Sequence, residues 1–419
     1  MKKFLLIEDS PIIVKIIKHL CKSDPELQCD TAASFSDAKK LIAENGADHY
    51  LVAVVDLNLP DAPDGEVVDF TIEQSIPTIV MTGNFDDSVR EKMQEKKIVD
   101  YVTKESRYSY EYVIKQIKRL DKNRDIKILV ADDSKVSRNY LKNLLEVQQF
   151  IVLTADDGDT ALDLINKDPD IKLLITDYNM PRMNGFELVK NIRKEVSKND
   201  LVVVGLSGEG DSALSAKFIK NGANDFLNKP FGQEEFNCRI LHDIENMEYV
   251  QTMRHMAYHD YITGLPNKRK FFEAGNPLLK EAITTNSPSS LALLSVDELD
   301  QVQDKYGIDA PDTVLKNLAG LLPKAFGRFH YARINDSDIA ILMVGLDCDK
   351  ASKLIDGFRH IVEDHIVLFD ERSFNFSISA GIVSAENHSL IDLLQRADNR
   401  AHTAKEEGGN QVISSDQIN

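Results

Sequence analysis

The chain has 419 residues, of which 42% are hydrophobic and 28% are charged, and its formal net charge is -18 at pH 7. This length exceeds what a single hydrophobic core usually organises, and the composition is typical of globular domains rather than of a disordered or fibrous chain. The negative charge repels nucleic-acid phosphates and anionic membrane surfaces, so it argues against a DNA-binding output.

The amino terminus lacks the apolar run of a signal peptide, and no later run approaches the length of a membrane span. The cysteines are too few for a disulfide framework and show no paired spacing typical of zinc sites: Cys21, Cys29, Cys238 and Cys348. We therefore expect reduced, mostly buried thiols and a cytoplasmic protein without a membrane partner.

An internal repeat with an offset of about 124 residues organises the first part of the chain. Short continuous apolar runs alternate with amphipathic stretches, which indicates parallel sheets covered by helices on both faces. Each repeat is therefore predicted to be a doubly wound α/β unit. The landmarks that recur in the same order are Phe4–Ser10 and Ile128–Ser134, Val52–Asp56 and Leu173–Asp177, Thr82-Gly83 and Ser207-Gly208, and Asp100–Lys104 and Asp225–Lys229.

Polar residues in each repeat follow predicted strand ends, where the functional crevice of such sheets lies. An acidic pair after the first strand and an aspartate after the third bring carboxylates together at one edge, and such hard oxygen ligands suit Mg²⁺. A hydroxyl residue after the fourth strand and a lysine after the fifth complete a position where a phosphoryl group could be held.

On these residues, both repeats resemble the receiver domain of two-component response regulators. The resemblance implies a flavodoxin-like domain with a five-stranded parallel sheet. It also implies that Asp56 and Asp177 accept phosphoryl groups from a sensor histidine kinase or phosphotransfer protein.

The resemblance assigns further roles around each acceptor, with one Mg²⁺ per domain. In the first repeat the implied metal ligands are Glu8, Asp9, Asp56 and the carbonyl of Asn58. In the second repeat they are Asp132, Asp133, Asp177 and the carbonyl of Asn179. Phosphoryl contacts would come from Thr82, Lys104, Ser207 and Lys229, and the aromatic switch positions are Tyr101 and Phe226.

The two repeats differ in two details. Lys104 precedes Glu105, whereas Lys229 precedes Pro230, which is the usual arrangement in the family and often a cis peptide. The loop after the acceptor is also one residue longer in the first repeat. We therefore expect the two repeats to differ in phosphorylation kinetics.

The junctions between domains also differ. Charged residues predict a short connector at 121–126 between domains at 1–120 and 127–243. Apolar residues then recur every three or four positions from Phe236 onward without glycine or proline, which predicts a helical linker at 244–259. This helix would either relay a change in receiver packing and pair in a homodimer, or merely dock on its own domain.

The region 260–419 begins with Asp260–Arg269, which closely resembles the opening signature of GGDEF domains, the catalytic units of diguanylate cyclases. Asp312 and Lys405 also match the family in order and spacing. The resemblance implies an α+β domain with a central antiparallel sheet.

Several functional positions of that family are changed. Serine replaces both acidic metal ligands, at Ser295 and Ser337, and a serine hydroxyl cannot supply their charge at neutral pH. Gln303 replaces the guanine-binding asparagine, and Phe326 and Phe329 replace the product-inhibition motif. The signature hairpin reads Asn335, Asp336, Ser337, Asp338 and Ile339 instead of Gly-Gly-Asp/Glu-Glu-Phe. The domain is therefore predicted to be degenerate and without cyclase activity.

The leading hypothesis is a phosphorylation-controlled response regulator with a non-catalytic output domain for dimerisation or partner docking. One alternative is a phosphorylation-activated diguanylate cyclase that makes cyclic di-GMP from GTP. Another is an effector that binds cyclic di-GMP or another guanine nucleotide without making it.

Overall fold

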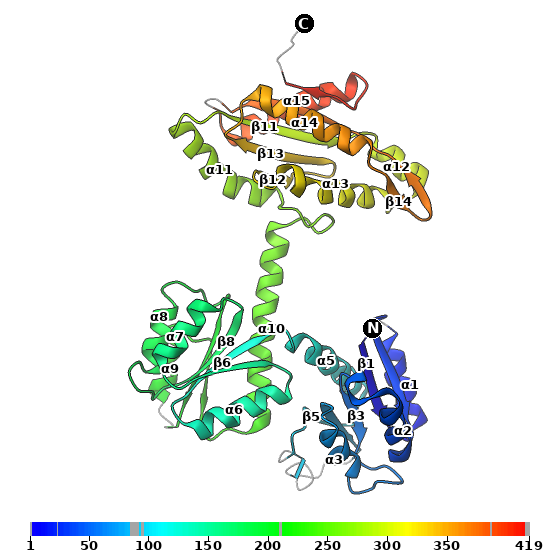
Figure 1. Cartoon of the computed structure of the whole chain (residues 1–419), viewed down its shortest axis with the longest axis vertical. Coiled ribbons are helices and arrows are strands. Elements are labelled where there is room, and N and C mark those ends of the chain that lie inside the picture. Colours follow the sequence, from blue (N-terminus) through cyan, green and yellow to red (C-terminus); the bar gives the residue numbers. More distant parts are fainter. Residues whose placement is uncertain are drawn as a thin grey trace. The chain divides into compact units, whose positions relative to one another are not determined.

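The computed structural model describes residues 2–22, 24–83, 92–93, 96–208, 212–385 and 388–414. The chain divides into two compact units, Met1–Val250 and Gln251–Asn419. The first unit contains both repeats, and the second contains the C-terminal region (Figure 1). Among the described helices, none combines the length and apolar content that a membrane span requires.

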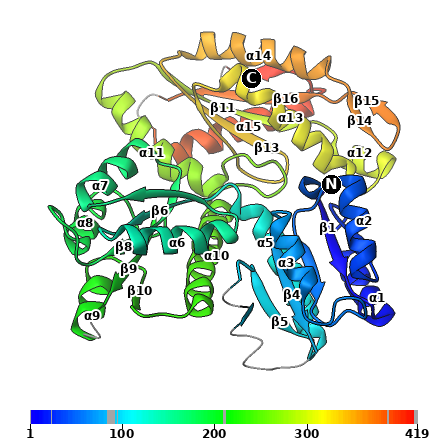
Figure 2. The ribbon, with the colours of Figure 1, turned by 60° about the horizontal axis from the view of Figure 1, so that its bottom comes forward.

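The first repeat is a parallel sheet with the strand order β2-β1-β3-β4-β5. Its core strands are continuously buried, because helices cover both faces (Figure 2). Helices α1 and α5 cover one face, and α2 and α3 cover the other. The elements are β1 (Lys2–Ile7), α1 (Pro11–Cys21), β2 (Leu27–Ala32), α2 (Phe35–Asn45), η1 (Ala47–His49), β3 (Ala53–Asp56), α3 (Glu66–Glu73), β4 (Thr78–Thr82), β5 (Asp100–Thr103) and α5 (Arg107–Asn123).

The second repeat has the same topology, with the strand order β7-β6-β8-β9-β10 and parallel pairing throughout. Helices α6 and α10 cover one face, and α7, α8 and α9 cover the other. The elements are β6 (Lys127–Ala131), α6 (Lys135–Val147), β7 (Ile151–Ala155), α7 (Gly158–Lys167), β8 (Ile171–Asp177), α8 (Gly185–Ile192), β9 (Val202–Ser207), α9 (Ser212–Lys220), β10 (Asp225–Asn228) and α10 (Gln233–Tyr258). The predicted doubly wound fold of both repeats is confirmed.

Helix α10 has two parts with different surroundings. Its first part buries Phe236, Ile240, Ile244 and Met247 in the core of the second repeat. Beyond these residues, apolar side chains such as Met253 are more than half exposed. The apolar periodicity therefore continues past the domain on which the helix docks.

The C-terminal unit has a five-stranded sheet with the order β12-β13-β11-β16-β17. Helices α12, α13 and α14 pack with one core cluster, and α11 and α15 pack with the other. The elements are α11 (Lys268–Thr284), β11 (Ser289–Val296), α12 (Leu299–Tyr306), α13 (Ala310–Phe326), β12 (His330–Arg333), β13 (Asp338–Val344), α14 (Cys348–Glu363), β14 (Val367–Phe369), β15 (Arg372–Phe374), β16 (Ile378–Ser384), α15 (Leu390–Glu406) and β17 (Val412–Ile413).

The predicted antiparallel centre of the C-terminal sheet is confirmed, and the sheet also contains one parallel pair, between β17 and β16 at its edge. The first half of the expected connector at 121–126 belongs to α5, which continues to the buried Asn123. The cysteines are free thiols as expected, but the expectation that most are buried is wrong, because only Cys21 among them is buried.

Candidate functional site

The predicted site of the first repeat lies where β1, β3 and β5 end. One ligand atom from each of Glu8, Asp9 and Asp56 lies within 4.8 Å of the others. Glu8 and Asp56 are buried, whereas Asp9 is exposed. Such a set of hard carboxylate oxygens, open to solvent on one side, fits a divalent cation such as Mg²⁺.

Lys104 links two of these acids. Its Nζ atom lies 2.7 Å from Glu8 Oε2 and 2.7 Å from Asp56 Oδ2. The backbone N–H of Asn58 donates to Asp56 Oδ1 at 3.2 Å. Burial raises the pKa of Glu8, and the contacts with Lys104 oppose that rise. Three neighbouring acids, two of them buried, with one lysine carry more negative than positive charge, so the cluster favours an additional cation.

The second repeat has a similar site, in which a lysine and a serine contact the acids. Lys229 Nζ lies 2.7 Å from Asp132 Oδ2 and 2.6 Å from Asp177 Oδ1. Burial raises the pKa of Asp177 against the opposing effect of Lys229. Burial lowers the pKa of Lys229, but its hydrogen bonds to the two acids outweigh this, so its pKa lies above the ordinary value.

A serine makes the chief difference between the repeats. Ser137 Oγ donates to Asp132 Oδ2 at 2.6 Å, whereas the equivalent position of the first repeat holds Ile13. In the part of the chain that the structure describes, Asp132, Asp133 and Asp177 do not form a cluster as tight as that of the first repeat. The second site is therefore partly satisfied by neutral donors.

The remaining predicted receiver positions lie at the same strand ends. The backbone N–H of Lys104 donates to the Thr82 carbonyl at 2.8 Å, and that of Lys229 donates to the Ser207 carbonyl at 2.7 Å. Asn179 donates its backbone N–H to Asp177 Oδ2 at 2.7 Å. The switch positions differ in environment: Phe226 is buried against Phe218 with ring centroids 5.3 Å apart, and Tyr101 is partly buried. The bond between Lys229 and Pro230 is cis.

In the C-terminal unit, the two serines at predicted metal positions meet on one carboxylate. Ser295 lies opposite Asp338 in the antiparallel pairing of β11 and β13, and its hydroxyl donates to Asp338 Oδ1. Ser337 Oγ donates to the same oxygen at 2.9 Å, and Asn335 Nδ2 donates to Asp338 Oδ2 at 2.5 Å. Both oxygens of this buried carboxylate are thus engaged by neutral donors.

Asp297, two residues after Ser295, is satisfied in the same way. Ser379 Oγ donates to its Oδ1 at 2.7 Å, and Ser377 Oγ donates to its Oδ2 at 2.6 Å. The backbone N–H of Asn410 also donates to Oδ2 at 2.9 Å. Neither Asp297 nor Asp338 has an ion pair among the described residues. The donor set here fits hydrogen-bonded carboxylates better than a metal site.

Other predicted positions of the C-terminal unit are more scattered. Gln303 is exposed on α12, while Asp312 on α13 and Lys405 on α15 are partly buried. Asp336 and Ile339 flank the Asp338 network, and the Asp336 carbonyl accepts a hydrogen bond from Arg333 at 2.8 Å. Phe326 lies in the core rather than at a polar site.

Two features of these sites were not found from the sequence. Ser137 gave no signal, because a serine in the first turn of a helix is also a common capping residue. Arg333 anchors the hairpin by donating to the Asn335 carbonyl at 3.0 Å and to Asp260 Oδ1 at 2.8 Å. The hydrogen bonds to Asp260 lower its pKa although burial opposes them. The spacing of 73 residues between Arg333 and Asp260 follows no periodicity that could have predicted this pair.

Comparison with known families adds to this geometry. A family model described as the response regulator receiver domain matches residues 4–110 and 128–241, which is more than half of the chain. The chain belongs to the response regulator family. A second model, described as the diguanylate cyclase GGDEF domain, matches residues 257–411. The repeats are therefore receiver domains, and the C-terminal unit is a GGDEF domain.

Individual relatives agree with this architecture. A chemotaxis protein CheY homolog from Campylobacter jejuni is 43% identical over 107 residues, which cover 25% of this chain and 82% of the relative. The response regulator PleD from Caulobacter vibrioides is 23% identical over 299 residues, which cover 68% of this chain but 65% of that protein.

A solved structure of a two-component system response regulator/GGDEF domain protein has a TM-score of 0.54 and 36% identity. The match covers 59% of this chain and 100% of that one.

Proposed function

We propose that this response regulator accepts phosphoryl groups on Asp56 and Asp177 and relays that state to a GGDEF domain that performs no catalysis. The observation that carries the proposal is the contrast between acids. Glu8, Asp9 and Asp56 lie close together, and one lysine pairs with Glu8 and Asp56. Asp338, by contrast, accepts hydrogen bonds from the hydroxyls and the amide that stand at the family's metal site.

The receivers supply the parts for phosphoryl transfer. A carboxylate oxygen of Asp56 would attack the phosphorus of a phosphohistidine, so that a P–O bond forms while the P–N bond breaks and the imidazole leaves. Lys104 forms an ion pair with Asp56, so it is placed to neutralise the charge of the added phosphoryl oxygens. A Mg²⁺ ion held by Glu8, Asp9, Asp56 and the Asn58 carbonyl would offset the negative charge of the reactants. The donor would be a sensor histidine kinase or a phosphotransfer protein.

The same chemistry is proposed for the second receiver, with Asp177 as acceptor and Lys229 as its cation. Asp132, Asp133 and the Asn179 carbonyl would hold its Mg²⁺. Because Ser137 and Lys229 both contact Asp132, we expect this site to bind Mg²⁺ more weakly than the first.

The GGDEF domain is proposed to act in dimerisation or partner docking. Catalysis would require two metal ions on the GTP triphosphate, and the acids at that position are engaged by hydroxyl and amide donors. Tyr249, Met253 and Met256 leave an exposed apolar stripe on α10, which suits pairing with a second copy. The expected cytoplasmic location stays a prediction.

Phosphorylation of defined variants tests the receiver assignment. Acetyl phosphate with Mg²⁺ should add a phosphoryl group to both receivers, detected by intact-protein mass spectrometry. Asp56→Asn and Asp177→Asn should each leave one modified site, and the double variant should leave none. Modification of the double variant at the wild-type level, or none in the wild type with any competent donor, would contradict the proposal.

Sedimentation tests the output role. Beryllofluoride with Mg²⁺ should increase the homodimer fraction of the wild type at tens of micromolar protein, roughly the range in which weak pairing becomes visible. Met253→Glu should reduce that fraction, because it places a charge in the exposed stripe of α10. A wild type that stays monomeric in both states would exclude a relay through dimerisation.

A further inference from the structure

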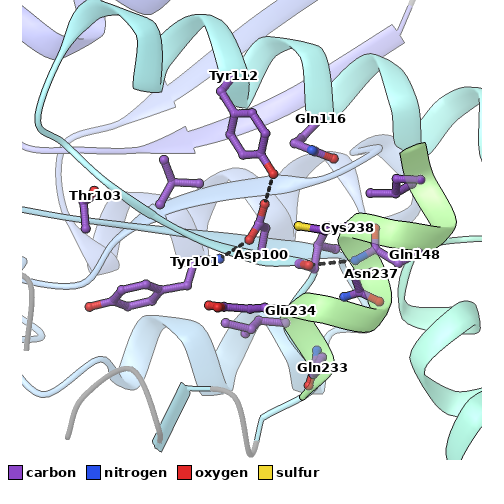
Figure 3. A pocket seen from close by; sticks show the side chains of 14 residues that line it. Asp100, Tyr101, Thr103, Tyr112, Gln116, Gln148, Gln233, Glu234, Asn237 and Cys238 are labelled. Carbon is purple, nitrogen blue, oxygen red and sulfur yellow. Dashed lines mark hydrogen bonds between the residues drawn. The ribbon is translucent and has the colours of Figure 1, made fainter. Parts of the chain in front are cut away.

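A cavity of about 280 Å³ lies within the first unit, where the first receiver meets α10 of the second. Residues of β5 and α5 line one side, and residues of α10 together with Gln148 line the other (Figure 3). Its polar side chains include Asp100, Tyr112, Gln148, Glu234 and Asn237. None of the lining residues is lysine, arginine or histidine.

Specific contacts between the receivers hold this junction together. Arg119 on α5, whose side chain is 5% exposed, lies 2.8 Å from Glu248 on α10. Gln148 Nε2 donates to the Val99 carbonyl at 2.8 Å, and Asn123 Nδ2 donates to the Gln148 carbonyl at 2.8 Å. The cavity therefore belongs to a built interface rather than to a chance gap.

Asp100 is the acid at the centre of this site. Its Oδ2 accepts a hydrogen bond from the Tyr112 hydroxyl at 2.7 Å, and its Oδ1 accepts one from the backbone N–H of Tyr101 at 2.8 Å. The described residues offer it no ion pair. Burial raises the pKa of Asp100, and the nearby charge of Glu234 adds to that rise. The site is thus short of positive charge.

Two amide oxygens at the cavity also lack partners. Gln148 is 3% exposed, and no described group donates to its Oε1 atom; the same is true of Asn237 Oδ1. The Gln148 amide nitrogen is fixed by its bond to Val99, which leaves the oxygen as the unpaired atom. Unpaired buried acceptors are destabilising, so these atoms call for a hydrogen-bond donor.

The second receiver shows what meets this need at the equivalent position. Asp225 corresponds to Asp100 in the repeat, and its Oδ2 lies 3.0 Å from Arg239 Nη1. The hydrogen bond to Asp225 is the largest cause of the raised pKa of Arg239. Arg239, which has a positive charge and N–H donors, therefore neutralises Asp225. At the equivalent position of the first receiver, Asp100 faces the cavity.

We propose that this cavity binds a compact cation with N–H donors, an ammonium group that takes the place that a guanidinium fills beside Asp225. Such a group supplies both the charge that Asp100 lacks and donors for Gln148 and Asn237. The cavity exceeds the roughly 30 Å³ share of one water molecule, and water could pair the amides but would leave the carboxylate uncompensated. The bound cation stabilises the packing of α10 against the first receiver, one residue from the switch position Tyr101.

Thermal unfolding of the full chain tests the proposal with ammonium or methylammonium chloride as the probe. Tetramethylammonium chloride at the same concentration is the control, because it carries the charge without N–H donors. At tenfold the dissociation constant, ammonium should raise the apparent melting temperature by about 2–4 °C more than the control. Equal shifts with both salts, or no shift with either, would overturn the proposal.

Matched variants locate the effect. Asp100→Asn should remove the difference between the melting temperatures in the two salts. Asp225→Asn should retain that difference, because Asp225 pairs with Arg239 and does not need the added cation. Asn237→Lys should also remove the difference while the protein stays folded, because a tethered ammonium group would fill the site. Hydrogen exchange of peptides that cover Val99 to Tyr112 should slow with ammonium in the wild type. An unchanged response in Asp100→Asn and Asn237→Lys would place the cation elsewhere and contradict the assignment.

Discussion

The receivers and the GGDEF domain both bring carboxylates to strand ends, but the partners of these carboxylates differ. A lysine pairs with them in the receivers, whereas neutral hydrogen-bond donors contact them in the GGDEF domain. In the first receiver, Glu8 and Asp56 share one lysine, and Asp9 stands beside them without a described hydrogen-bond partner. In the GGDEF domain, the oxygens of Asp338 accept from two hydroxyls and one amide, and those of Asp297 from two hydroxyls and one backbone N–H.

The difference shows that a buried acid does not by itself make a cation site. What matters is whether acceptors outnumber the donors that the fold supplies. Excess acceptors leave room for a metal ion, while a saturated carboxylate gains little from one and would have to give up existing hydrogen bonds. The second receiver lies between these extremes, since Ser137 already engages Asp132.

Removing the lysine of the first receiver should have the largest effect on stability. Lys104→Met leaves Glu8 and Asp56 buried without their cation, and breaking such a pair costs about 3–5 kcal/mol. Hydrogen exchange with mass spectrometry at pH 7.5 should show faster exchange confined to peptides of the first receiver. The control Lys229→Met should have a smaller effect, because Lys229 is 27% exposed and Ser137 still pairs with Asp132. Equal effects of both changes would contradict this reading.

Restoring acids to the GGDEF domain should change nucleotide binding next most strongly. Ser295→Asp with Ser337→Glu replaces two donors to Asp338 by anionic ligands, so Mg²⁺-dependent GTP binding should tighten at least tenfold, or about 1.4 kcal/mol. Calorimetry measures the affinity, with Ser295→Ala and Ser337→Ala as the uncharged control. Turnover should remain poor, because Gln303, Asn335 and Asp336 are unchanged. A variant no tighter than the control would mean that charge is not what the site lacks.

The effect of Mg²⁺ on the first receiver should depend on pH. Burial raises the pKa of Glu8, so the stability that this group contributes is present at pH values below its ordinary pKa and is lost as the pH rises through its raised pKa. Mg²⁺ favours the ionised form, and its stabilising effect should therefore be larger at pH 7.5 than at pH 5. At tenfold the dissociation constant the stabilisation is about 1.4 kcal/mol, measured by hydrogen exchange of the first receiver. A larger effect at pH 5 would reverse the assigned sign.

Exchanging the residue that distinguishes the two receiver sites should have the smallest measurable effect. Ser137→Ile removes a hydrogen bond to Asp132, and Ile13→Ser offers the first receiver the equivalent hydroxyl. A hydrogen bond contributes about 0.5–1.5 kcal/mol, so Mg²⁺ affinity should rise about two- to tenfold in the second receiver and fall in the first. Titration of each variant in an Asp56→Asn or Asp177→Asn background separates the two sites. Unchanged affinities would show that Ser137 does not compete with the metal.

Elements with a repeated or periodic residue pattern could be predicted from the sequence. Contacts between residues far apart in the chain could not. Continuous apolar runs and repeated strand-end acids predicted both parallel sheets and brought Glu8, Asp56 and Lys104 together, because strand ends share one edge. The junction was beyond reach, since Arg119 and Glu248 lie 129 residues apart on faces that look like ordinary solvated helix. The parallel pairing of β17 was also missed, because a two-residue strand carries no periodicity.

Synthesis of cyclic di-GMP tests whether the GGDEF domain has lost catalysis. Purified wild-type protein, with and without beryllofluoride, would be incubated with GTP and Mg²⁺ beside the double variant Ser295→Ala and Ser337→Ala, and the product measured by mass spectrometry. The hydrogen-bonded state of Asp338 predicts no cyclic di-GMP above the double variant in either condition. Product formed by the wild type above that control would show that the GGDEF domain is a working cyclase and would contradict the proposed loss of catalysis.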